Sequence, residues 1–64
     1  MFSFEETMDP HSVDVMRDGR IVARLQWHSR MPMRVVTTGA FAEFTVAELR
    51  AMIAELERRV DRDL

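Results

Sequence analysis

A chain of 64 residues that is 47% hydrophobic and carries a formal net charge of −2 is long enough for one small folded domain and too apolar for a disordered segment. It has no cysteine, which excludes disulfides and thiolate metal ligands. No apolar run approaches the roughly 20 residues of a membrane-spanning helix. The first six residues lack the basic start of a signal peptide. We therefore expect a soluble protein of the cytoplasm.

Two short alternating segments open the chain. Residues 1–6 place Phe2 and Phe4 on one side of a predicted strand. Pro10 interrupts the pattern, because proline lacks the N–H that a strand ladder needs. Residues 11–17 then alternate again, which predicts a second strand.

Asp18 and Gly19 separate this second strand from another alternating segment, residues 20–27. An Asp-Gly pair between alternating segments predicts a β-hairpin with a type I′ turn, which needs positive φ at both central residues. The expected inward side chains are Val13, Val15, Ile21, Ala23, Leu25 and Trp27. The expected outward side chains are Asp14, Met16, Val22, Arg24, Gln26 and His28.

A further strand is predicted over residues 31–37, after a short connection at 28–30. Pro32 favours an edge position for this strand, because the N–H that proline lacks would there point to solvent and not to a neighbouring strand. We expect Met33 and Val35 to point inward and Arg34 and Val36 to point outward.

The last segment predicts a helix from about residue 45 to 60. Thr45 and Glu48 have the spacing of a capping box, in which each side chain accepts a hydrogen bond from the other residue's backbone N–H. Phe41 and Phe44 precede it and are expected to join the core. Apolar residues recur at spacings of 3 and 4, which indicates one buried stripe. The stripe comprises Val46, Leu49, Ile53, Leu56 and Val60.

The order of these elements predicts the fold class α+β. A three- to four-stranded antiparallel sheet packs one face against one C-terminal α-helix and exposes the other face. Residues 1–64 form a single domain. The expected core combines the inward strand residues and the phenylalanines with the middle of the helical stripe.

No catalytic or metal-binding constellation is visible. Asp9, His11 and His28 lack the tight spacing of zinc ligands. Glu5 and Glu6 are neighbours on a strand, so their carboxylates point to opposite faces and cannot flank one substrate. No nucleophile motif and no glycine-rich phosphate loop is present. We therefore expect no enzymatic activity, no metal and no cofactor.

The outward face of the sheet is the best candidate for binding a partner, since its mixture of apolar side chains and arginine is typical of interfaces. The alternatives are a plain solvated face and a homodimer formed through this face or an edge strand. The predicted partner-binding residues are Asp14, Arg24, Gln26, His28 and Arg34.

The number and position of the arginine residues suggest nucleic-acid binding as a further alternative. All nine basic residues are arginine, which fits either a GC-rich genome or a preference for arginine at interfaces. Five of them lie between residues 17 and 34, where they would contact phosphates. The isoelectric point of about 5.6 argues against a dedicated nucleic-acid binder.

The segment from Val15 to His28, together with Phe44 to Leu49, resembles small proteins encoded by phages and mobile elements of GC-rich bacteria. Some phage proteins of this size and layout are anti-CRISPR inhibitors, which cover a surface of a bacterial defence complex without catalysis. The resemblance implies an inhibitor of this kind that acts in the host cytoplasm. It assigns no individual binding residue. A minor structural component of a phage particle is the alternative that the same resemblance allows.

Overall fold

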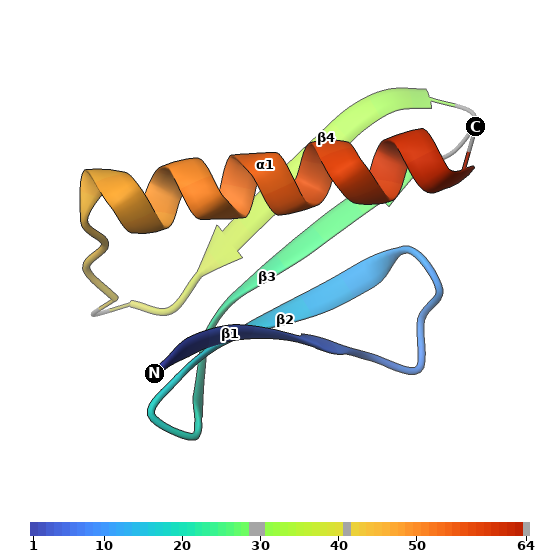
Figure 1. The fold of residues 1–64 in the computed structure, drawn as a ribbon. Coiled ribbons are helices and arrows are strands. Elements are labelled where there is room, and N and C mark those ends of the chain that lie inside the picture. The colour runs from blue at the N-terminus through green and yellow to red at the C-terminus, as the bar shows by residue number, and fades with distance from the viewer. Residues whose placement is uncertain (29–30, 41, 64) are drawn as a thin grey trace.

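The computed structural model of the chain describes residues 1–28, 31–40 and 42–63, with side chains over 1–28, 34–40 and 42–61. In these residues four strands precede one helix: β1 (Phe2–Glu6), β2 (Ser12–Arg17), β3 (Arg20–His28), β4 (Met31–Thr38) and α1 (Val46–Asp63). The strands form one antiparallel sheet in the order β1-β2-β3-β4, and α1 lies across one face (Figure 1). The predicted α+β class is confirmed, and β4 has the predicted edge position.

The turn between β2 and β3 has the predicted conformation. Asp18 has φ of 52° and Gly19 has φ of 80°, so both central residues occupy the left-handed region that a type I′ turn requires. Glycine adopts this conformation without the steric cost of a Cβ atom, and aspartate tolerates it better than most residues. Local chemistry at two residues therefore sets the pairing of β2 with β3.

A β-bulge interrupts that pairing. Val15 lies opposite Ala23 and Met16 lies opposite Ile21, so Val22 is an extra residue in β3. The bulge reverses the alternation of the strand. Ile21 shares the outward face with Met16 and is 59% exposed, whereas Val22 packs against the core. The sequence prediction for Ile21 and Val22 was wrong because a strict period of two does not foresee the added residue.

The face assignment of β4 was also wrong. Val36 lies opposite Leu25 and Val35 lies opposite Gln26. Residues directly opposite in an antiparallel pair share a face, so Val36 is on the helix side and Val35 is on the outward side. Arg34 accompanies Val36 on the helix side. Two adjacent valines fit either phase of a strand, and the pairing with β3 decides between them.

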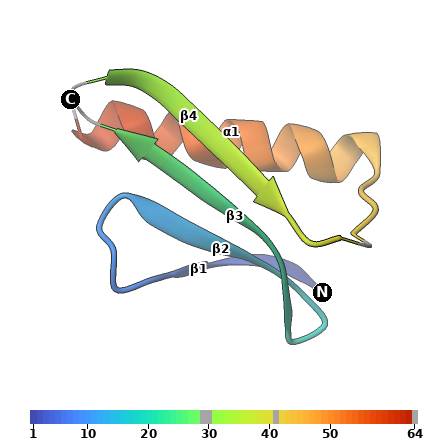
Figure 2. The same cartoon turned by 180° about the vertical axis from the view of Figure 1, so that it is seen from behind.

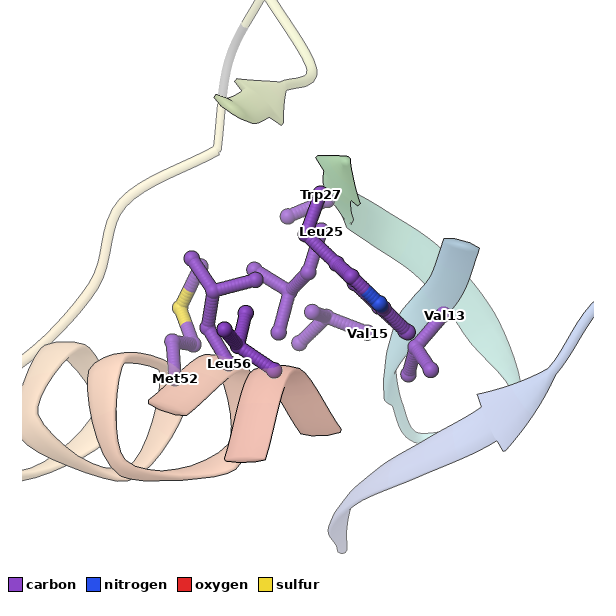
Figure 3. Packing of buried hydrophobic residues seen from close by; sticks show 8 residues of the cluster. Val13, Val15, Leu25, Trp27, Met52 and Leu56 are labelled. Carbon is purple, nitrogen blue, oxygen red and sulfur yellow. The ribbon is translucent and has the colours of Figure 1, made fainter. Parts of the chain in front are cut away.

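The core lies between α1 and the middle of the sheet. Figure 3 shows Met52 and Leu56 of α1 directed toward Val15, Leu25 and Trp27 of the strands. Phe2, Phe4 and Phe44 are partly buried against this cluster, and Met33 and Phe41 were predicted core residues whose side chains lie outside the described residues. Among the described residues the buried cluster comprises Val13, Val15, Ala23, Leu25, Trp27, Met52, Leu56 and Val60.

The helix is rotated relative to its predicted orientation. Met52, Leu56 and Val60 are buried, whereas Leu49 and Ile53 are exposed. Successive residues of a helix are separated by about 100°, so burial of Met52 in place of Ile53 shifts the buried stripe sideways. The predictions for Leu56 and Val60 are confirmed, those for Val46, Leu49 and Ile53 are wrong, and Met52 was missed.

Candidate protein-binding surfaces

The outward face of the sheet brings four of the five predicted binding residues together. Asp14 and Arg24 lie directly opposite each other on β2 and β3, and the Arg24 Nε atom donates to Asp14 Oδ1 at 2.9 Å. The guanidinium of Arg24 is therefore already matched by an acidic neighbour. Its exposed edge remains open to solvent, but its charge is not a free anchor for an acidic partner.

Gln26 and His28 line a pocket of about 350 Å³ at one end of this face. The rings of His11 and His28 are stacked, with centroids 6.4 Å apart and planes within 13°. His11 is placed by its backbone N–H, which donates to Asp9 Oδ1 at 2.9 Å in the turn after β1. The pocket wall is completed by Asp9, Trp27 and Val35. This corner combines the rings of His11, Trp27 and His28 with one aliphatic side chain and two polar ones.

Arg34 does not belong to this group. Its position opposite Trp27 puts it on the helix side of β4, where it is exposed. The predicted binding set is therefore divided between two faces of the sheet. Partner binding by Asp14, Arg24, Gln26, His28 or Arg34 stays a prediction.

The sequence prediction missed a second surface, on α1. Val46, Leu49 and Ile53 recur on one flank of the helix and are 63%, 43% and 54% exposed. We call these three residues the apolar flank. Arg50 and Glu57 border it on the solvent side, and both are exposed. Contiguous exposed aliphatic residues of this kind mark interaction sites more often than isolated ones do.

The opposite flank of α1 is tied to the first two strands by ion pairs. Arg59 Nη1 lies 2.6 Å from Glu6 Oε1 at the end of β1. Arg17 Nη2, at the end of β2, lies 2.8 Å from Glu48 Oε1. Because this flank faces β1 and β2, the apolar flank faces the β4 side of the molecule. There Val36 on the helix side of β4 is 43% exposed, so α1 does not cover this part of β4.

The start of α1 is a polar cluster built on the predicted capping box. The Thr45 backbone N–H donates to Glu48 Oε1 at 2.9 Å, and the Glu48 N–H donates to Thr45 Oγ1 at 3.1 Å. Arg17 also donates to the Glu43 carbonyl at 2.8 Å, and its guanidinium lies 5.2 Å from the centre of the Phe44 ring. One arginine thus joins the end of β2 to the helix start.

These contacts shift the titration of two helix carboxylates. The hydrogen bond from the Thr45 backbone, followed by that from Arg17, holds the pKa of Glu48 below its ordinary value. Burial raises the pKa of Glu55, but hydrogen bonds from Arg58 and Arg59 outweigh it and lower the pKa overall. Both carboxylates are therefore ionised in the folded protein at neutral pH.

Acidification is expected to lower the melting temperature (Tm). A carboxylate whose folded pKa is depressed adds stability above its unfolded pKa, and this is lost as the pH falls through the folded pKa. We expect Tm to fall between about pH 5 and about pH 3, and to fall less steeply in Glu48→Gln. Thermal melts followed by circular dichroism measure this. The control is Glu57→Gln, whose exposed side chain makes none of these contacts and whose acid profile should match the parent's. An unchanged acid slope in Glu48→Gln would contradict the role of the cap.

Neither a cluster of metal ligands nor a membrane-spanning helix occurs among the described residues. These residues contain no group of three or more histidine, cysteine, aspartate or glutamate side chains placed to hold a metal ion. Nor does the part of the chain that the structure describes include a helix with the length and hydrophobicity of a membrane span.

Comparison with protein-family models, curated proteins and solved structures gives no significant match for this chain. The resemblance to small phage proteins therefore stays a prediction. The case for function depends on the surfaces described above.

Proposed function

We propose that this protein is a non-catalytic protein-binding module and that the apolar flank of α1 is its main contact surface. The proposal is carried by one observation: a well-capped helix leaves Val46, Leu49 and Ile53 exposed on one side. Burying such side chains against a partner removes apolar surface from water, at about 25 cal/mol per Å² before the costs of association. A folded chain of this size gains little by leaving three neighbouring aliphatic residues exposed.

The surroundings of the flank fit a protein partner. Arg50 and Glu57 are exposed beside it, which gives the apolar centre and charged rim that protein interfaces share. A nucleic acid would instead need free positive charge. Within the Arg-rich hairpin, Arg17 and Arg24 are both paired with carboxylates, which weakens that alternative.

As the partner we propose a surface of a bacterial defence complex in the host cytoplasm, which this protein would cover as an anti-CRISPR-like inhibitor. The support for this choice is the resemblance of the hairpin and the capped helix to small phage proteins. The outward-face residues Asp14, Arg24, Gln26 and His28 are a second candidate contact in the same complex. Their polar character suits the edge of an interface better than its centre.

The flank is tested with two matched variants, Ile53→Asp and Ile21→Asp. The two isoleucines are similarly exposed, but Ile53 lies on the flank and Ile21 lies on the outward face of the sheet. Immobilised protein is titrated with purified CRISPR effector complexes, and affinity is measured by interferometry. We expect Ile53→Asp to weaken binding at least about tenfold, as for a central interface residue, and Ile21→Asp to change it by less than about twofold.

Three outcomes would contradict the proposal. Equal losses in the two variants, or a loss confined to Ile21→Asp, would remove the flank as the contact surface. Failure to bind any effector complex would remove the proposed partner class. Retention of labelled DNA or RNA with a steep loss on added salt would favour the nucleic-acid alternative.

A further inference from the structure

From Arg34 to Thr38, the outer edge of β4 carries fewer charges than the other edge of the sheet. Figure 2 shows the sheet from the side away from α1, with β4 as an outermost strand, and no described strand pairs with its outer side. The edge strand β1 carries Glu5 and Glu6, and charges of this kind discourage pairing with another chain. From Arg34 to Thr38, β4 carries one charge, on Arg34, followed by two valines and two threonines.

The register identifies the backbone groups that face this edge. The Gly39 N–H donates to the Val22 carbonyl at 3.2 Å, so these two residues form a hydrogen-bonded pair. In an antiparallel ladder such pairs alternate with pairs that share no hydrogen bond. Val35, opposite Gln26, therefore bonds to β3, whereas Val36, opposite Leu25, does not.

It follows that Arg34, Val36 and Thr38 direct their N–H and C=O groups away from β3. These three residues are evenly spaced, and Val36 is at their centre. The outward-facing backbone groups are therefore arranged symmetrically about Val36. A two-fold axis at Val36, perpendicular to the sheet, superposes the set of unpaired groups on an identical set from a second copy.

We propose that two copies of this protein pair through β4, in an antiparallel register centred on Val36. Val36 then lies opposite Val36 of the partner subunit, and Arg34 lies opposite Thr38 of the partner subunit. No like charges meet in this register, and each valine meets a neutral residue on its own face. A second copy is the occupant because the edge is complementary to itself, both in its hydrogen-bonding groups and in its charges.

The dimer contains a continuous eight-stranded sheet with both copies of α1 on the same face. Because each apolar flank faces the β4 side of its own subunit, the two flanks face each other across the joined strands. The inference goes beyond the proposed function and does not depend on it, since pairing uses the backbone of β4 and not the flank.

Sedimentation of the protein tests the pairing, with Val36→Pro and Val35→Pro as matched variants. The wild type is expected at twice the 7.5 kDa of one chain. Val36→Pro removes the central edge donor without touching the β3 ladder, so we expect a folded monomer with unchanged circular dichroism. Val35→Pro removes a donor to β3 and is expected to lower Tm instead. The flank variant Ile53→Asp is expected to remain dimeric, which separates this test from that of the proposed function.

Amide hydrogen exchange on the wild type decides the matter even if Val36→Pro fails to fold. We expect the amides of Val36 and Thr38 to become protected as concentration rises through the dimerisation range, and those of Val35 and Thr37 to be protected at every concentration. A protein that stays monomeric up to about 1 mM would overturn the proposal. A dimer whose Val36 amide exchanges freely would also overturn the proposal. A folded Val36→Pro variant that is still dimeric would do the same. If only an unrelated extended peptide protects the amides of this edge, that peptide and not a second copy is the occupant of the edge.

Discussion

Leu56→Ala is expected to lower the free energy of unfolding by about 2–5 kcal/mol, and Leu49→Ala by less than about 1 kcal/mol. The two leucines lie on the same helix, and the same atoms are removed. Leu56 is buried against the sheet, whereas Leu49 is on the apolar flank. Only the first substitution leaves a cavity in the core. Because leucine and alanine have similar helix propensities, the difference between the two variants reports burial.

Urea or guanidinium unfolding followed by circular dichroism measures both values. A domain of 64 residues is expected to have a total stability of about 3–10 kcal/mol, so Leu56→Ala removes a large part of it. Equal losses at Leu49 and Leu56 would show that both residues are in the core. That result would restore the helix orientation predicted from the sequence and remove the apolar flank.

Trp27→Ala is expected to cost about 3–5 kcal/mol, the range for removing a large buried aromatic side chain. Trp27 is 5% exposed and belongs to the core cluster, together with residues of β2 and α1 (Figure 3). Ile21→Ala, on the same strand, is the control, and its cost is expected to stay below about 1 kcal/mol. The bulge turns Ile21 outward, so shortening its side chain leaves no buried cavity.

Thermal and chemical unfolding measured by circular dichroism suit both variants. The wild type offers a second probe, because Trp27 is its only tryptophan and its fluorescence will shift to longer wavelength on exposure to water. A cost at Ile21 as large as that at Trp27 would mean that β3 alternates without a bulge. A small cost at Trp27 would place the core elsewhere.

Local chemistry explains why the elements were predictable. The hairpin depends on Asp18 and Gly19, and the helix start depends on Thr45 and Glu48, all close together in the chain. The faces of the middle strands followed from alternation, so burial of Leu25 was predicted together with exposure of Arg24. These features need no information from distant residues.

The errors arise where distant residues decide the outcome. The bulge at Val22 depends on how β3 pairs with β2, and the phase of β4 depends on its register with β3. The side of α1 that faces the sheet also carries Arg59, which pairs with Glu6, 53 positions away in the chain. No local pattern contains this information.

The candidate site was predicted in part for the same reason. Four residues of the outward face follow from alternation, whereas Arg34 depends on the β4 register. The apolar flank left one signal in the sequence. Met52 broadens the apolar arc of the helix beyond the stripe that begins at Val46, and the sheet buries Met52 while Val46 stays exposed.

The order β1-β2-β3-β4 also bears on how the chain folds. Each strand pairs with its neighbour in the sequence, so the sheet assembles by successive short closures without waiting for the ends of the chain to meet. Chains rich in such local contacts cross their folding barrier rapidly. Docking of α1 is the step that joins the last part of the chain to the first, through Arg59 and Glu6. A ribosome-bound chain can therefore complete its hairpins before the helix has emerged.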